Sequence, residues 1–252
     1  MKIKFVCLNL WFGGKLWENV VDFIRKENPD ILALQEVVKS SDSRAPINYN
    51  TLNELEKIFH YPCSHNAPTF VSTRPDMPTA EFSNAVLSKF PIINSKTTFY
   101  DVPYDVNYHE MQDFSFTPRN LEHVEIDLGT KNVNVFNTQG IWGFDGDDNE
   151  RRLKMSEIIQ KNYQGKQNVI LCGDFNTKEN SKSMLSFEKD LINVFKGELV
   201  TSFNMRHKPA GSGFATAVVD MVYLSPEIKV IEHYSTDDDV TDHVPLVCKF
   251  EL

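Results

Sequence analysis

Several residues with acidic, amide or imidazole side chains stand where apolar segments of the sequence end. They are Asn9, Glu36, Asn84, Gln139, Asp174, Asn176, Asp220, Asp242 and His243. Side chains at the ends of strands gather at one edge of an α/β sheet, where substrates bind. Taken singly, each residue also fits an ordinary turn or a solvated surface position. As a set, they predict a site that holds a hard cation and a phosphate.

Two short motifs place complementary groups side by side. Asp174 and Asn176 flank Phe175, so in an extended backbone their side chains point to the same face. A carboxylate beside an amide can hold a water molecule and a phosphate oxygen together. Asp242 precedes His243 directly, which brings a carboxylate next to an imidazole before an apolar strand.

The donor types favour magnesium or manganese over a softer metal. Glu36 offers a hard anionic oxygen, and Mg²⁺ prefers oxygen ligands and keeps several waters. The sequence contains neither an HExxH pattern nor a cysteine cluster, either of which would indicate zinc.

The elements that must position these residues follow from the hydrophobic pattern. Strands are expected at Lys2–Leu8, Ile31–Leu34, Phe82–Ser88, Ile92–Tyr100, Arg119–Leu128, Asn132–Thr138, Asn168–Cys172, Val218–Leu224, Lys229–Tyr234 and Val244–Phe250. Helices are expected at Leu16–Lys26, Thr51–Phe59, Glu150–Tyr163 and Lys182–Asp190, and rim loops at Ser64–Ala80, Asp101–Pro118, Gly140–Asp148 and Ser202–Thr216. Both halves supply strands followed by helices, which predicts an α/β (α+β) four-layer sandwich of two stacked mixed β-sheets flanked by helices.

Bulk composition bounds the class of protein. The 252 residues carry a net charge of −9, so we expect one domain, 1–252, that is not a general nucleic-acid binder. The four cysteines are widely spaced without a CxxC motif, which suits a reducing compartment. No apolar run approaches the roughly 20 residues of a membrane span. These features predict a cytoplasmic protein. We expect a monomer, although the sequence does not determine the oligomeric state.

Six segments together carry a family resemblance. LNLWFGG, PDILALQEV, SNAVLSKFPI, ILCGDFNT, VVDMVYLS and TDHVPL occur in that order along the chain. In order and spacing they resemble the endonuclease/exonuclease/phosphatase superfamily, which includes deoxyribonuclease I, abasic-site endonucleases, neutral sphingomyelinases, inositol-polyphosphate 5-phosphatases and tyrosyl-DNA phosphodiesterases. The resemblance runs from Lys2 to Phe250 and implies the DNase I-like fold and a Mg²⁺- or Mn²⁺-dependent phosphoester hydrolase.

The resemblance also implies a role for each residue. Glu36, Asn9 and Asp242 would make up or support the metal site. Asp174 would orient or deprotonate the attacking water, and Asn176 would bind the scissile phosphate. His243 would hydrogen-bond the phosphate, with Asp220 fixing its tautomer. Asn84 and Arg119 would be substrate-side residues, and the planar guanidinium of Arg119 suits phosphate.

One position departs from the pattern. Many members have a histidine just after the strand equivalent to Asn132–Thr138, whereas this chain has Gln139. Glutamine can donate a hydrogen bond but cannot supply a proton at neutral pH, so help from a general acid at this position is in doubt. Glu81 lies where the nuclease-like branch places a carboxylate that partners the missing histidine, which makes it a candidate partner for Gln139.

The sequence leaves three hypotheses about the substrate and the function. The first reading is hydrolysis of a phosphodiester or phosphomonoester of a small molecule, a lipid-derived group or a nucleotide, and the acidic composition favours it. The second is a nuclease or nucleic-acid end-processing enzyme, and the third is a pseudoenzyme or binding module, which only Gln139 supports. Rim residues that could stack on a base or cover an apolar group are Trp142, Phe144, Tyr104, Tyr108 and Phe203. Arg206, His207 and Lys208 form a small basic stretch that could meet a second phosphate.

Overall fold

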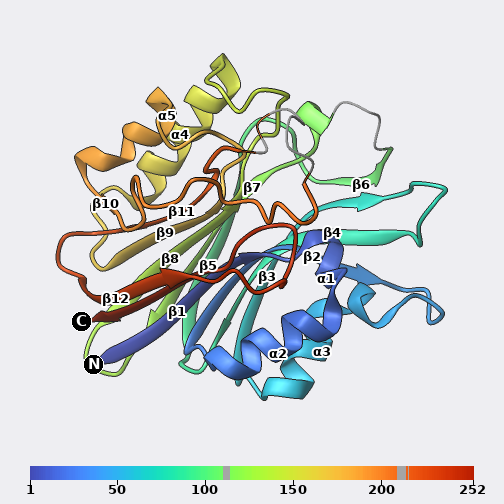
Figure 1. The fold of residues 1–252 in the computed structure, drawn as a ribbon, viewed down its shortest axis with the longest axis horizontal. Helices are drawn as coiled ribbons and strands as arrows, with labels where there is room; N and C mark the ends of the chain where they lie inside the picture. The colour runs from blue at the N-terminus through green and yellow to red at the C-terminus, as the bar shows by residue number, and fades with distance from the viewer. Residues whose placement is uncertain (110–113, 209–213, 215) are drawn as a thin grey trace.

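Two mixed β-sheets pack face to face and carry helices on their outer faces (Figure 1). The computed structural model describes residues 1–109, 114–208, 214 and 216–252. The seven-stranded sheet has the order β12-β13-β1-β2-β4-β3-β6, and the six-stranded sheet has the order β10-β11-β9-β8-β7-β5. The two chain ends lie side by side, and the Met1 ammonium donates to the Leu252 carbonyl at 2.9 Å.

The strands of the first sheet are β1 (Lys2–Asn9), β2 (Ile31–Ser40), β3 (Cys63–Ser72), β4 (Ala80–Ser88), β6 (Asp105–Tyr108), β12 (Lys229–Ser235) and β13 (Leu246–Glu251). Those of the second are β5 (Ile92–Phe99), β7 (Asn120–Asp127), β8 (Asn132–Gln139), β9 (Val169–Asp174), β10 (Ile192–Asn193) and β11 (Asp220–Leu224). The helices are α1 (Trp11–Gly14), α2 (Trp17–Glu27), α3 (Thr51–Phe59), α4 (Glu150–Tyr163) and α5 (Lys182–Leu185), with 3₁₀ turns at Ile47–Tyr49, Phe114–Phe116 and Phe187–Lys189.

Three buried clusters account for the layering. The central one lies between the sheets and includes Phe5, Val135 and Cys172. The second packs the outer face of β1 and β2 against α2, and the third packs β8, β9 and β11 against α4 and α5. β1, β2, β8 and β9 are therefore buried on both faces, which explains the apolar runs of β1, β2 and β9. The predicted four-layer sandwich of two stacked mixed sheets is confirmed.

Parallel pairing brings the candidate residues to one edge. β1 and β2 are parallel, with Asn9 opposite Gln35, and β8 and β9 are parallel, with Gln139 opposite Asp174. β11 runs antiparallel to β9, so its first residue, Asp220, lies beside Asp174. The carboxyl ends of β1, β8 and β9, the middle of β2 and the start of β11 thus meet at the same edge of the sandwich.

The predicted loop Ser64–Ala80 is wrong over most of its length. β3 occupies Cys63–Ser72 and pairs with β4, although its sequence is polar and contains Pro68. The register shifts between Pro68 and Phe70, and a bulge of this kind tolerates a proline that cannot donate to the ladder.

The boundaries of other predicted elements also differ from those in the structure. The predicted loop Asp101–Pro118 contains the short edge strand β6, and the predicted helix Lys182–Asp190 divides into α5 and a 3₁₀ turn. β2 continues to Ser40 instead of stopping at Leu34. Parts of the rim loops Asp101–Pro118 and Ser202–Thr216 lie outside the described residues.

Candidate active site

A cavity of about 500 Å³ opens at the edge where the strand ends meet. Its polar lining comprises Glu36, Thr117, Arg119, Gln139, Asp174, Asn176, Lys208, Asp242 and His243. Most of the predicted site residues therefore share one cavity, although they come from widely separated parts of the chain.

An irregularity in β2 delivers Glu36 to the cavity. The register between β2 and β4 shifts between Leu34 and Val37, and Glu36 has a φ of 56°. A left-handed glutamate is unfavourable in isolation, and such strain concentrates at functional sites. The bulge separates two neighbours: Gln35 points between the sheets and donates to Asn137 at 2.6 Å, whereas the Glu36 carboxylate faces the cavity.

Asn9 joins two of the carboxylates from behind. Its Nδ2 donates to Glu36 Oε1 and to Asp174 Oδ2, both at 3.1 Å, and its Oδ1 accepts from the Trp11 backbone N–H at 3.0 Å. The side chain is 1% exposed and does not line the cavity. Both ends of the amide are engaged, so its geometry fits a residue that holds Glu36 and Asp174 in place.

Asp174 is buried and held by three donors. Its Oδ1 accepts from the backbone N–H of Asn176 at 2.9 Å, and its Oδ2 accepts from Asn9 and from Asn176 Nδ2 at 3.3 Å. Asn176 Nδ2 also donates to the Gly140 carbonyl at 3.2 Å, so contacting a phosphate would require it to exchange one of these bonds. Burial, and next the charge of Asp220, raise the pKa of Asp174.

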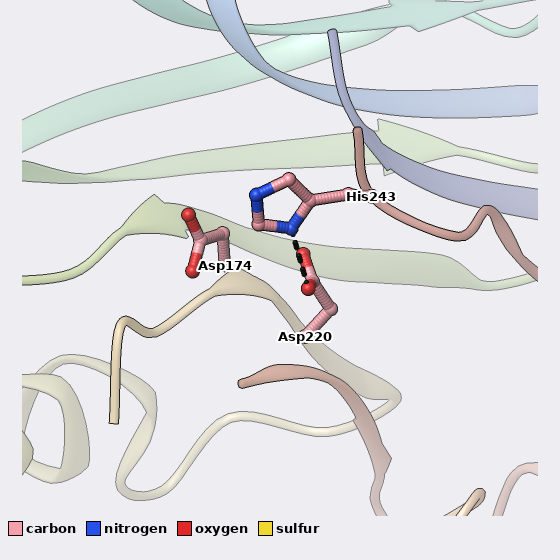
Figure 2. Close-up of side chains that lie close together, drawn as sticks. All are labelled: Asp174, Asp220 and His243. Carbon is pink, nitrogen blue, oxygen red and sulfur yellow. Dashed lines mark hydrogen bonds and ion pairs between the residues drawn. The ribbon is translucent and has the colours of Figure 1, made fainter. Parts of the chain in front are cut away.

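Asp220 and His243 form a buried pair. Figure 2 shows the imidazole between two carboxylates, with its Nδ1 bonded to Asp220 Oδ2 at 2.7 Å and its other nitrogen on the side where Asp174 lies. Burial alone would lower the pKa of His243, but the charges of Asp220 and Asp242 outweigh it and raise that pKa to about 10. The bond fixes the ring and leaves Nε2 free to act towards the cavity.

These three residues also form a geometric cluster that could hold a metal ion. Ligand atoms of Asp174, Asp220 and His243 lie within 4.8 Å of one another. The hydrogen bond between Asp220 and His243 Nδ1 already uses one ligand atom of each, so the pair fits an oriented imidazole better than a metal ligand set.

Gln139 connects Arg119 to Glu36. Arg119 donates to Gln139 Oε1, and Gln139 Nε2 donates to Glu36 Oε1 at 2.7 Å. The suggested Glu81–Gln139 contact is wrong, because Glu81 accepts from the Tyr104 hydroxyl at 2.7 Å while the Gln139 amide turns to Glu36. The amide thus has a structural partner at each end.

Lys208 introduces a positive charge among the carboxylates. Its Nζ lies 2.9 Å from Asp242 Oδ2 and 5.0 Å from the centre of the Phe203 ring. Burial opposes its charge, but Asp242, Glu36 and Asp174 outweigh burial and raise the pKa of Lys208. The other oxygen of Asp242, Oδ1, is buried and has no hydrogen-bond partner among the described residues.

Several predicted residues do not reach the cavity. Asn84 is buried in the middle of β4, and its amide donates to Asn120 Oδ1 at 3.0 Å. Tyr104 bonds Glu81, and Tyr108 packs its ring 5.0 Å from that of Phe70. His207 bonds Asp239 at 2.7 Å. The aromatic candidates that do line the cavity are Trp142, Phe144 and Phe203.

Sequence reasoning missed two kinds of residue. Trp11 and Phe12 line the cavity and have φ values of 55° and 53°, and their place beside Gly13-Gly14 was the available signal. Arg152 is completely buried and donates to the carbonyls of Ile141 at 3.0 Å and Asn176 at 2.9 Å. Nothing in the helical sequence around Arg152 separates it from a surface residue.

The two stacked mixed sheets, flanked by helices and carrying this site at one edge, define a DNase I-like protein. The sequence profile of the Endonuclease/Exonuclease/phosphatase family matches residues 7–243, and the chain belongs to that family. Members of this family are in general phosphoester hydrolases. A search of curated proteins finds none that matches the chain.

Solved structures share the fold at low sequence identity. An endonuclease/exonuclease/phosphatase from Beutenbergia cavernae DSM 12333 has a TM-score of 0.78 at 16% identity, over 100% of this chain and 72% of the other. TDP2 from D. rerio, complexed with a single strand DNA product, has a TM-score of 0.72 at 13% identity, over 100% and 99%. A mannosyl-6-phosphatase from Bacteroides thetaiotaomicron VPI-5482 has a TM-score of 0.65 at 14% identity, over 99% and 100%.

Proposed function

We propose that the chain, as one domain of residues 1–252, is a Mg²⁺- or Mn²⁺-dependent phosphoesterase that hydrolyses small phosphate esters by water attack. The observation that carries the proposal is the convergence of Glu36, Asp174, Asp242 and the Asp220–His243 pair around one cavity. These residues come from the bulge in β2, the end of β9, the start of β11 and the loop before β13. No packing requirement demands that three carboxylates face the same opening.

The donor set fits a divalent cation. Glu36 and Asp242 present carboxylates to the cavity, and one Asp242 oxygen is buried without a partner among the described residues. A lysine ammonium also lies against this cluster, which supports a site that attracts positive charge. Glu36 and Asp242 would therefore hold the cation, with Asn9 positioning Glu36. When bound, the cation would neutralise charge on the phosphate and its leaving oxygen.

The remaining groups bind and orient the reactants in this proposal. The Asp174 carboxylate accepts from the attacking water, and its burial favours the protonated form that results. His243 Nε2 and the Arg119 guanidinium donate to phosphate oxygens, and Asp220 keeps the imidazole oriented. Gln139 supports the site by linking Arg119 to Glu36. Positioning and electrostatic stabilisation supply most of the rate acceleration in phosphoryl chemistry.

The direct test is hydrolysis of bis-p-nitrophenyl phosphate and p-nitrophenyl phosphate with added Mg²⁺ or Mn²⁺. We expect turnover of at least one ester that disappears on adding EDTA and returns with excess Mn²⁺. We also expect His243→Ala to lose most of this activity, since it removes a donor to the phosphate. Turnover that survives both EDTA and His243→Ala, or no turnover on any ester, would contradict the proposal.

Lys208 yields a prediction about cation binding that does not depend on turnover. Replacing Lys208 with methionine removes a positive charge from the carboxylates of Asp242, Glu36 and Asp174. We expect Mn²⁺ to bind about tenfold more tightly, because a charge a few ångströms away contributes about 1 kcal/mol or more. Mn²⁺ titration followed by electron paramagnetic resonance measures this.

The exposed Lys57, which pairs with Glu54 on α3, provides the matched control. Lys57→Met should leave the Mn²⁺ affinity unchanged. Unchanged or weaker binding in Lys208→Met would show that the carboxylates near Lys208 are not the cation site.

Two alternative functions are less well supported than the proposed one. The likeness to TDP2, which was solved with a DNA product, supports a nuclease, but the net charge of −9 opposes broad binding to nucleic acid. A binding module would need a lost catalytic group, and Gln139 is instead accommodated by bonds to Arg119 and Glu36. The four free thiols support the proposed cytoplasmic location. The protein is further proposed to be a monomer. Among the described residues, no helix is long and apolar enough to span a membrane.

A further inference from the structure

The apolar wall of the cavity is aromatic throughout its described residues. The chain has 18 Phe and 3 Trp, and nine of these residues line the cavity. Among the described lining residues there is no Leu, Ile, Val, Met or Ala. A site for an alkyl chain would be expected to use such aliphatic side chains, so the composition points to a ligand with a ring.

One ring cluster forms a fixed side of the cavity. Phe70 and Phe82 stack with their centroids 5.0 Å apart, and Phe12 meets Phe82 edge to face at 5.8 Å. Phe70 and Phe82 are also packed into a buried cluster with Val38. Their positions are therefore set by the first sheet, and they offer a rigid surface to a ligand.

A second ring cluster is centred on the loop that follows β8 in the six-stranded sheet. Trp142 lies between Phe114, at 5.7 Å, and Phe144, at 4.7 Å, with both contacts edge to face. Although it contacts Trp142, Phe144 is 67% exposed, so most of its apolar surface faces solvent, which is costly for a phenylalanine. Arg152 holds this loop through the carbonyl of Ile141. The loop thus presents exposed ring surface beside the phosphate-binding groups.

The charged lining groups gather in one part of the cavity, which Phe12 and Phe203 border. The cationic side chains among the described lining residues are Arg119, Lys208 and His243, and all belong to the cluster around the carboxylates. A nucleic-acid strand needs a track of positive charge beyond the reacting phosphate as well as stacking surfaces. The volume, about 500 Å³, is that of a small-molecule site.

We propose that the substrate is a small phosphate ester whose alcohol portion carries an apolar aromatic ring system, held between the Phe70–Phe82 pair and the Trp142–Phe144 pair. This inference rests on the proposed function, because it assigns the phosphate to the polar end of the same cavity. Ring–ring contacts at edge-to-face and offset angles then select the aromatic group over an aliphatic group of the same size.

The test compares naphthylmethyl phosphate with decahydronaphthylmethyl phosphate, each also as its methyl diester. In both, a methylene separates the ring from the ester oxygen, so the leaving alcohols are similarly acidic and differ mainly in aromaticity. We expect kcat/KM to be at least about tenfold higher for the naphthyl ester, which corresponds to two favourable ring contacts. The double variant Trp142→Leu, Phe144→Leu should reduce this preference to about threefold or less by slowing the naphthyl ester selectively.

Phe116 supplies the matched control, since it is an exposed phenylalanine outside the cavity lining. Phe116→Leu should keep the full preference. Should the double variant fold poorly, Phe144→Leu alone, at the exposed position, gives the same comparison with a smaller effect.

Binding of the uncleavable phosphonates separates this inference from the proposed function. If no ester is hydrolysed but naphthyl phosphonate still binds about tenfold more tightly than its saturated counterpart, the subsite stands and the catalytic proposal fails. Hydrolysis of both esters with equal kcat/KM, or an equal loss on both in the double variant, would overturn the aromatic subsite. Faster cleavage of short single-stranded DNA, with steep salt inhibition, would also overturn it in favour of a nuclease.

Discussion

Glu36→Gln is expected to lower phosphoester hydrolysis by about 1,000-fold or more, while the protein stays folded. The change removes one negative charge from the proposed cation site and keeps the size of the side chain. Cation assistance is worth several kcal/mol and each 1.36 kcal/mol is tenfold in rate, which gives this order of magnitude. Glu36 Oε1 also accepts from Gln139 and Asn9, and Oε2 accepts from the Phe12 backbone N–H at 2.9 Å, so the NH₂ group of glutamine would face a donor in either orientation.

Glu81→Gln is the matched control because it makes the same chemical change on the rim. Glu81 bonds Tyr104 and is not among the residues that line the cavity. Activity should be measured beside Mn²⁺ binding by electron paramagnetic resonance and the urea midpoint of unfolding. We expect Glu36→Gln to lose both activity and Mn²⁺ affinity with little change in the midpoint, and Glu81→Gln to keep all three. Full activity and full Mn²⁺ affinity in Glu36→Gln would refute the assignment of the cation site.

The polar residues at strand ends could be predicted because local pattern and general topology suffice for them. β1, β2 and β9 are buried on both faces, so each has an apolar run that ends sharply at a polar residue. Parallel neighbours end at the same edge of a sheet, which brings Gln139 beside Asp174 in one sheet and Asn9 beside Gln35 in the other. The motif resemblance added the partners Asp220 and His243.

The left-handed backbone of Glu36 could not be predicted in the same way. A glutamate in an apolar strand gives no local sign of a positive φ, unlike glycine or asparagine. The bulge is imposed by the pairing of β2 with β4, where Leu34 faces Ala85 and Val37 faces Ser83. Strand β2 therefore continues past the glutamate at which the sequence predicted its end.

Lys208 and Asn84 show the same limit for individual contacts. Lys208 reaches Asp242 across a loop, and the pattern around it indicated only a basic stretch. Asn84 follows the rule of a polar residue in an apolar strand, yet its partner Asn120 lies on the facing sheet, which turns it into the core. Which of two polar residues faces the cavity depends on pairing partners that sequence periodicity does not specify.

Arg152→Met is expected to destabilise the fold by about 3–5 kcal/mol, since removing one member of a buried charged network leaves its partners unsatisfied. The guanidinium is completely buried and donates to the carbonyls of Ile141, Asp147 and Asn176, as well as to the Asp145 carboxylate at 3.4 Å. Methionine would fill much of the space but could satisfy none of these acceptors. Arg152 joins the loop that carries Trp142 to the segment that carries Asn176, so its loss would loosen both.

The neighbouring Arg151 separates this network from a general need for arginine on α4. Its side chain is partly exposed and pairs with Asp101, so Arg151→Met should cost about 1 kcal/mol or less. Urea unfolding followed by tryptophan fluorescence measures both variants, and a common m-value would show that the same transition is compared. If Arg152→Met unfolded at the same urea concentration as Arg151→Met, the buried guanidinium would have no special part in holding the two loops. A much lower urea midpoint for Arg152→Met than for Arg151→Met would identify Arg152 as the residue that couples the aromatic wall of the cavity to its polar end. This coupling would follow from its three bonds to carbonyl groups and not from any contact with substrate.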